Sequence, residues 1–153
     1  MQALENRIPP PVVTLLFALL MWLVARYVPG VELSHSTRLV VAALVVAIGL
    51  GFVLAGVLSF RRAQTTVNPL KPETTSALVT AGVYQYSRNP MYLGFALFLL
   101  AWACYLASPA ALLGPAGFVL YMNRLQIRPE ERALAALFGR EFQVYQERVR
   151  RWL

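Results

Sequence analysis

The sequence predicts an all-α membrane protein, a polytopic bundle of about four transmembrane helices followed by an amphipathic C-terminal helix. Of the 153 residues, 58% are hydrophobic and 14% are charged, whereas soluble domains have about 45–50% apolar and about 25% charged residues. The apolar residues form four long blocks, with most of the charges between and after them. This pattern excludes a soluble globular domain and predicts a single integral membrane domain over residues 1–153.

The first two apolar blocks, residues 12–28 and 39–60, are predicted spans. As a helix, residues 12–28 would rise roughly 25 Å, close to the ~30 Å hydrocarbon core, if Arg26 extends its charged end to the interface. Residues 39–60 contain no charged side chain and are long enough to cross without help. The first block has no small-residue cleavage site of the kind that ends a signal peptide, so we expect the N-terminal segment to be retained.

The third and fourth blocks, residues 90–107 and 109–122, predict a helical hairpin. They begin with Asn89-Pro90 and Ser108-Pro109, pairs in which the first residue can cap a helix and proline can occupy its first position. Residues 109–122 are few for a span and include Pro115. A tight hairpin with residues 90–107 is the simplest geometry for them.

The distribution of positive charge predicts the orientation. Twelve of the 14 Lys and Arg residues fall in the N-terminal segment, the loop 61–89 and the tail 123–153. Because short cytoplasmic loops carry the excess of positive charge, these segments and both termini are predicted to be cytoplasmic, in a membrane of the bacterial inner type. The charges lie beside apolar blocks, which favours membrane lipids over nucleic acid as their partner.

The tail contains two patterns of helical periodicity. Residues 128–131 are predicted to start a helix with Glu130 and Glu131 in its first turn. An apolar face of Leu134, Leu137 and Phe138 follows, and Glu130 lies nearer its centre than Glu131, so both carboxylates are expected to point toward the bundle. Past Gly139, an apolar stripe predicts an amphipathic helix lying on the membrane or over the site. This stripe consists of Phe142, Tyr145, Val149 and Trp152.

Two stretches of the sequence carry a more specific signal. Residues 82–94 read GVYQYSRNPMYLG, and residues 124–145 contain Glu130-Glu131, Leu134, Phe138-Gly139 and Tyr145. Together they resemble the isoprenylcysteine carboxyl methyltransferase and phospholipid methyltransferase superfamily, whose members show G-x-Y-x-x-x-R-H-P-x-Y-x-G and, later, E-E-x-x-L-x-x-x-F-G-x-x-[YF]-x-x-Y. Asn89 stands where these proteins usually have histidine. Asparagine forms hydrogen bonds but carries no proton near neutral pH, which argues against acid–base chemistry at this position.

The resemblance implies methyl transfer from S-adenosylmethionine to a lipophilic acceptor at the cytoplasmic membrane face. Arg88 is suited to the cofactor's carboxylate, and Glu130 or Glu131 to its ammonium or ribose hydroxyls. Tyrosine or carbonyl oxygens can stabilise the sulfonium, and Tyr84 and Tyr92 are the candidates for this role. Arg88 and Glu130 are the predicted catalytic residues, and no metal is expected, since the one cysteine, Cys104, lies in an apolar block. The predicted cofactor site consists of Gly82, Tyr84, Arg88, Asn89, Pro90, Tyr92, Glu130 and Glu131.

Other interpretations stay open at this point. A sterol-reductase-like enzyme that uses NADPH shares a similar arginine-proline-tyrosine stretch, and a non-enzymatic membrane adaptor could keep the same fold. Arg88 could be a lipid-headgroup anchor, and the two glutamates could only complement a helix dipole. The tyrosines could form an interface belt, to which Tyr86 is assigned. The acceptor, isoprenylcysteine carboxylate-like or phospholipid amine-like, is not decided by any motif.

Overall fold

The computed structural model describes residues 8–64 and 77–153, and helices are the regular secondary structure of these ranges. This confirms the all-α class. Part of the predicted loop 61–89 lies outside the described residues. The elements are α1 (Pro10–Tyr27), α2 (His35–Arg62), the 3₁₀ turn η3 (Gly82–Gln85), α3 (Pro90–Leu106), the 3₁₀ turn η4 (Pro109–Leu112), α4 (Leu113–Tyr121), the π-helical segment η5 (Met122–Ile127) and α5 (Arg128–Arg148).

The helices α1 and α2 are long and apolar enough to cross a membrane. Most of their large apolar side chains face outward, with Leu15 69% and Leu44 62% exposed. A core helix of a soluble protein would bury such residues, whereas a lipid-facing helix presents them to hydrocarbon. Two of the four predicted spans therefore have the properties of membrane helices, at bounds close to residues 12–28 and 39–60.

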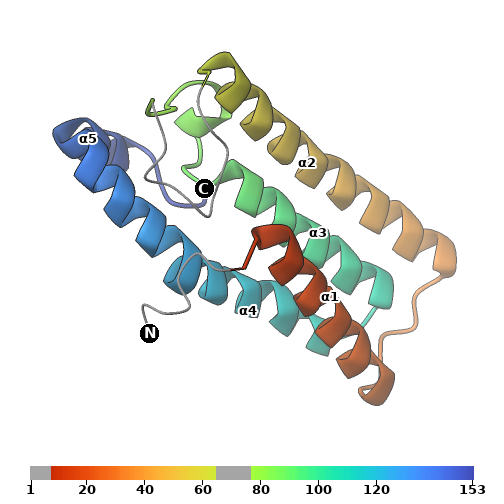
Figure 1. Cartoon of the computed structure of the whole chain (residues 1–153). Coiled ribbons are helices and arrows are strands. Elements are labelled where there is room, and N and C mark those ends of the chain that lie inside the picture. The colour runs from red at the N-terminus through yellow and green to blue at the C-terminus, as the bar shows by residue number, and fades with distance from the viewer. Residues whose placement is uncertain (1–7, 65–76) are drawn as a thin grey trace.

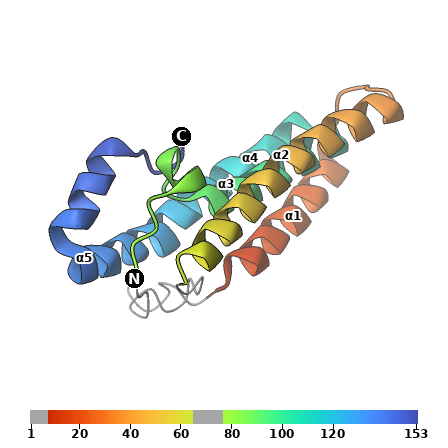
Figure 2. The ribbon, with the colours of Figure 1, turned by 90° about the horizontal axis from the view of Figure 1, so that it is seen from above.

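The third and fourth predicted spans are shorter in the structure. α3 has 17 residues, fewer than the ~20 of a typical transmembrane helix, and residues 109–122 are divided into η4, α4 and the start of η5. All four helices lie side by side in one bundle (Figure 1). Figure 2 shows that the start of α1, the end of α2 and the start of α3 lie at the same end as α5. That α3 and α4 also cross the membrane stays a prediction.

Close approach of α2 and α3 depends on glycine. A Cβ on Gly94 would lie 2.6 Å from the Gly49 carbonyl oxygen, and one on Gly56 would lie 2.6 Å from Met91. Small residues allow helix backbones to approach in this way in membrane proteins. The crossing fixes α3 and, with it, the chain segment that precedes it.

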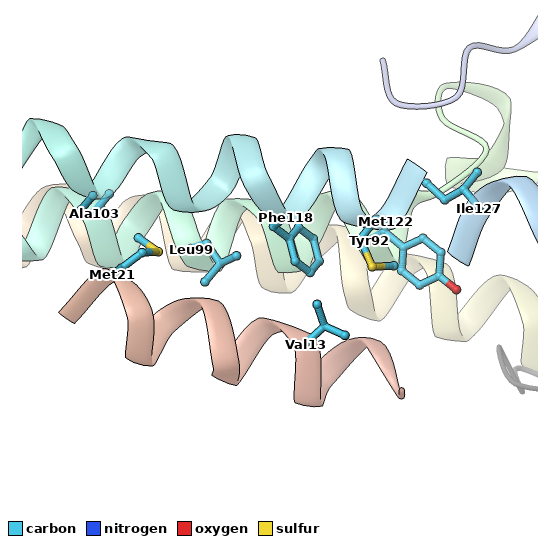
Figure 3. Packing of buried hydrophobic residues seen from close by; sticks show 9 residues of the cluster. Val13, Met21, Tyr92, Leu99, Ala103, Phe118, Met122 and Ile127 are labelled. Carbon is cyan, nitrogen blue, oxygen red and sulfur yellow. The ribbon is translucent and has the colours of Figure 1, made fainter. Parts of the chain in front are cut away.

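The bundle core runs along α1, α3 and α4 toward α5. Phe118 and Met122 are completely buried, next to Val13 and Leu99 (Figure 3). Tyr92 lies near the α5 end of this row, and its hydroxyl points toward α5. The packed core thereby fixes a polar atom at the end of the bundle.

Two of the predicted helix-start signals act differently in the structure. Asn89 and Ser108 do precede α3 and η4, but neither side chain caps its helix. The Asn89 carbonyl oxygen accepts from the Leu93 amide at 2.9 Å, while its side chain donates to another segment. Side-chain capping is seen instead at α2, where Ser34 accepts from the Thr37 amide at 3.1 Å.

The predicted helix start at residues 128–131 coincides with the first turn of α5, which contains Glu130 and Glu131, but the chain is already helical before it. Ile127 has helical dihedrals of −70° and −44°, so α4, η5 and α5 form one continuous helical path. Pro129 lacks an amide proton and its ring clashes with the carbonyl one turn earlier, and a π-helical segment directly before it relieves this conflict. Glu130 and Glu131 therefore extend from the fourth bundle helix itself.

A bend at Gly139 places the second half of α5 over η3. Gly139 has φ 48°, a left-handed conformation that favours glycine. Phe142, Tyr145 and Val149 are buried against Val79 and Tyr84, which favours a position over the site for the amphipathic helix. Two residues depart from the prediction: Leu137 is 47% exposed, and Trp152 packs with the bundle core.

The predicted orientation can be tested at the two ends of α2. In a Cys104→Ala background, Ser34→Cys and Gln85→Cys introduce single cysteines at exposed sites, and the 28-residue α2 separates them by about 42 Å. We expect a membrane-impermeant maleimide to label position 34 in cells with a permeable outer membrane, and position 85 only after the inner membrane is opened. Labelling of both positions from one side would contradict this topology.

Candidate functional site

A cavity of about 410 Å³ lies at the end of the bundle where α1, α2, η3, α3 and α5 meet. This volume is within the ~300–1,000 Å³ range of small-molecule sites. Six of the eight predicted site residues line it, so the two motifs come together in space. These residues are Tyr84, Arg88, Asn89, Tyr92, Glu130 and Glu131.

The other two predicted residues, Gly82 and Pro90, are not part of the cavity lining. Gly82 opens η3 with φ 65°, and a Cβ there would lie 2.9 Å from the Ser59 hydroxyl oxygen. Pro90 is the buried first residue of α3. Both shape the backbone that carries Tyr84 and Arg88, and direct contact with a ligand stays a prediction for them.

Glu130 is a buried carboxyl held by neutral donors. Its Oε1 accepts from the Tyr92 hydroxyl at 2.5 Å and from Gln126 Nε2 at 2.6 Å. Burial raises the pKa of Glu130 to about 7, although the two hydrogen bonds act in the opposite direction. This carboxyl is therefore close to half-ionised at neutral pH. Sequence reasoning missed Gln126, which lies one turn before Glu130 on the same helical face.

Glu131, in contrast, pairs with cations. Arg151 donates to both of its oxygens, from Nε to Oε1 at 3.1 Å and from Nη2 to Oε2 at 2.6 Å. Arg88 Nη1 lies 3.1 Å from the same Oε1. Arg151 was not among the predicted site residues, because helical periodicity places it away from the apolar stripe.

The Arg88 guanidinium has N–H donors without an acceptor in the part of the chain that the structure describes. Its side chain is 14% exposed, and among the described residues its Nε and Nη1 form no hydrogen bond. The contact with Glu131 is thus an ion pair without an aligned hydrogen bond. Burial lowers the pKa of Arg88 and Glu131 raises it, and a guanidinium stays charged in proteins. Because buried donors without acceptors are costly, Arg88 is suited to an anionic ligand group.

Aromatic residues form a further part of the cavity lining. The Tyr145 hydroxyl donates to the Tyr84 carbonyl oxygen at 2.7 Å and joins α5 to η3, and Phe60 packs edge-on against Tyr84 at 5.4 Å. Burial raises the pKa of Tyr84, so its phenol stays neutral. Tyr86 is exposed and lies outside the cavity lining. The apolar remainder includes Leu78, Met91, Phe95 and Phe142.

Asn89 contacts the C-terminal segment. Its side-chain Nδ2 donates to the Arg151 carbonyl oxygen at 3.0 Å, and its backbone N–H donates to the Ser87 hydroxyl oxygen at 3.1 Å. The side chain thus acts as a hydrogen-bond donor to backbone. This contact needs an N–H group but no titratable proton.

The family model of phospholipid methyltransferases matches residues 37–141, more than half of the chain. The chain belongs to this family. The matched range includes most of α2 and all of η3, α3 and α4, with Arg88, Tyr92 and both glutamates. The resemblance inferred from the two motifs is therefore confirmed.

Individual relatives agree with this assignment. Protein-S-isoprenylcysteine O-methyltransferase B of Arabidopsis thaliana is 33% identical over 88 residues, which are 58% of this chain and 45% of that protein. Protein-S-isoprenylcysteine O-methyltransferase of Saccharomyces cerevisiae is 35% identical over 85 residues, 52% of this chain and 33% of that protein. The chain thus spans less than half the length of either enzyme.

A shorter relative is uncharacterized. This protein of Haemophilus influenzae is 46% identical over 63 residues, which are 41% of this chain and all of the relative. No solved structure matches the chain. The named relatives therefore connect the chain with membrane methyltransferases, and the chemistry of its own site is argued from its residues.

Proposed function

We propose that the chain transfers a methyl group from S-adenosylmethionine to a lipophilic acceptor at the cytoplasmic face of the membrane. The observation that carries this proposal is Arg88, a half-buried cation whose Nε and Nη1 are buried without a hydrogen bond to any described residue, in the wall of a cavity that also holds Glu130. Opposite charges in one cavity match a zwitterionic ligand. The apolar walls match the hydrocarbon part of a lipid acceptor.

The residues present fit this cofactor. Arg88 would bind its carboxylate through the guanidinium fork, and Glu130 would bind its ammonium or a ribose hydroxyl. When bound, the cofactor supplies a methyl group activated by the positive charge on sulfur. The oxygens of Tyr84 and Tyr92 are lone-pair donors that stabilise such a cation without a formal negative charge. The chain would act mainly by positioning both reactants in a cavity with little water.

Two acceptor classes agree with the relatives. The names of the Arabidopsis and yeast relatives support an isoprenylcysteine carboxylate, and the family model supports a phospholipid amine. An assay with methyl-labelled S-adenosylmethionine can compare an S-farnesylcysteine derivative with phosphatidylethanolamine vesicles. The acceptor that takes up the label identifies the class.

Ligand binding by the purified protein in detergent tests the proposal against its alternatives. We expect saturable binding of S-adenosylhomocysteine and no binding of NADPH at the same concentrations, because Arg88 and Glu130 form one pair of opposite charges rather than a polyphosphate site. Binding of NADPH alone would support a sterol-reductase-like enzyme. Binding of neither ligand would support a membrane adaptor and overturn the proposed activity.

A further inference from the structure

The chain past α5 returns to two residues of the cavity lining, Arg88 and Asn89. Val149 is extended and buried, and the next residues contact the segment that precedes α3. The Arg88 amide donates to the Arg150 carbonyl oxygen at 3.0 Å, and Asn89 Nδ2 donates to the Arg151 carbonyl oxygen at 3.0 Å. Farther along, Trp152 Nε1 donates to Asn123 Oδ1 at 3.1 Å. Residues 149–152, the C-terminal strap, are thus held by side chains and backbone from two elements.

Arg151, in the strap, forms a bidentate ion pair with Glu131. Both carboxylate oxygens receive a hydrogen bond from the same guanidinium, which fixes the plane of the carboxylate. Arg88 reaches the same carboxylate with one nitrogen and without an aligned hydrogen bond. Arg151 therefore holds the acceptor that Arg88 would otherwise use.

The competition between the two arginines has a chemical consequence. Without Arg151, the Glu131 carboxylate could rotate and bind Arg88 through both oxygens, as arginine and carboxylate pairs commonly do. The donors of Arg88 would then be occupied before a ligand arrives. With Arg151 in place, two cations share one carboxylate, and a positive charge with free donors remains at the cavity wall.

We propose that Arg151 is a positioning residue, which holds Glu131 in the C-terminal strap so that Arg88 keeps its donors for the carboxylate of the cofactor. Asn89 takes part by fixing the strap through the Arg151 carbonyl oxygen. This role explains how asparagine can stand where the superfamily usually has histidine, since either side chain has an N–H donor. The inference rests on the proposed function, because it concerns the group that would bind the cofactor.

A double-mutant cycle on Arg151 and Glu131 tests this inference by titration with S-adenosylhomocysteine. We expect Arg151→Gln to weaken binding about tenfold in the parent, and to have less than about a twofold effect in a Glu131→Gln background. Removal of the Glu131 charge should rescue the Arg151 variant, because no carboxylate is left to occupy Arg88. If the strap only stabilised the fold, the two losses would add instead.

Kinetic measurements and a milder variant complete the test. Arg151→Gln should raise KM for the cofactor and leave KM for the acceptor unchanged. Arg151→Lys keeps the charge but not the bidentate geometry, so its affinity for the cofactor should fall between those of the parent and Arg151→Gln. It also provides a folded comparison if the glutamine variant does not extract as a single species. If Arg151→Lys and Arg151→Gln both bind the cofactor as tightly as the parent, the inference is wrong, while the proposed function is unaffected. Absence of binding by the parent would overturn the proposed function and the inference with it.

Asn89 offers an independent measurement of strap anchoring. Asn89→Ala removes the donor to the Arg151 carbonyl oxygen, and we expect it to weaken S-adenosylhomocysteine binding several-fold. Asn89→His retains an N–H donor and should bind within about twofold of the parent. If the alanine variant binds like the parent, the strap needs no anchor at Asn89 and this part of the inference is wrong.

Discussion

Arg88→Ala is expected to weaken the binding of S-adenosylhomocysteine by about 2–4 kcal/mol, the range for truncating one partner of a buried, hydrogen-bonded charge pair. The parent side chain is mostly buried and has donors without acceptors, so a ligand carboxylate would complete its hydrogen bonds. In the variant, that carboxylate would enter the cavity without a partner. Isothermal titration or fluorescence titration in detergent measures the loss directly.

The same substitution should leave the fold intact. Glu131 keeps both hydrogen bonds from Arg151 when Arg88 is absent, so no buried charge loses all of its partners. Arg88→Lys is the milder variant. An ammonium is a point charge without the planar fork, and we expect it to recover only part of the affinity.

Arg150→Ala is the matched control for Arg88→Ala. The Arg150 side chain is exposed, and the contact with the Arg88 amide uses its backbone carbonyl, which alanine retains. We expect a change within about 0.5 kcal/mol, as for other surface substitutions. Similar losses at positions 88 and 150 would indicate general electrostatic attraction and exclude a specific site at Arg88.

How far the sequence predicted this fold depended on the kind of signal. Apolar block length located α1, α2 and α3 to within a few residues, because uninterrupted apolar runs have few alternatives to a lipid-facing helix. Local capping signals were less reliable. At Asn89 the side chain has a better partner in the strap, and at Pro129 a π-helical segment carries the helix through instead of starting a new one.

The candidate site was predicted only where a motif covers it. The family motifs contain the six cavity residues, whose convergence depends on the packing of α3 against the helical path of α4, η5 and α5, where Tyr92 meets Glu130. Gln126 and Arg151 belong to no quoted motif, and their importance comes from contacts. For Arg151, these contacts require the bend at Gly139 and a strap that leaves the helix. Periodicity assumes a straight helix, so it could not place Arg151 beside Glu131.

The second large effect is expected at Glu130, through its charge. The pKa of about 7 for Glu130 means that a carboxyl in the free protein must lose a proton to pair with the ammonium of the ligand. Affinity for S-adenosylhomocysteine should therefore rise between about pH 6 and pH 8, by up to tenfold per unit below the pKa. Stability should change in the opposite sense. The folded pKa exceeds the ordinary 4.5, so the folded state binds more protons between these values and loses stability as pH rises.

Glu130→Gln separates the charge from the shape of this side chain. The amide keeps the size and one oxygen acceptor for Tyr92, so packing should change little, and the variant should extract from the membrane like the parent. At pH 8 we expect a loss of about 2–3 kcal/mol in binding, the range for removing one partner of a desolvated charge pair. At pH 6 only about a tenth of the parent carboxyl is ionised, so the difference between the two proteins should shrink by about 1.4 kcal/mol, the equivalent of a tenfold change in affinity.

Glu131→Gln is the comparison that assigns this effect to one carboxylate. Glu131 is held by arginines rather than by neutral donors, so its replacement should cost less affinity and should preserve the rise between pH 6 and pH 8. The proposed role of Glu130 thus predicts a flat pH profile in one variant and a parental profile in its neighbour. If Glu130→Gln keeps the parental profile, the titrating group lies elsewhere. If both variants bind like the parent at pH 8, the two carboxylates do not contact the cofactor, and the cofactor site has been assigned to the wrong residues.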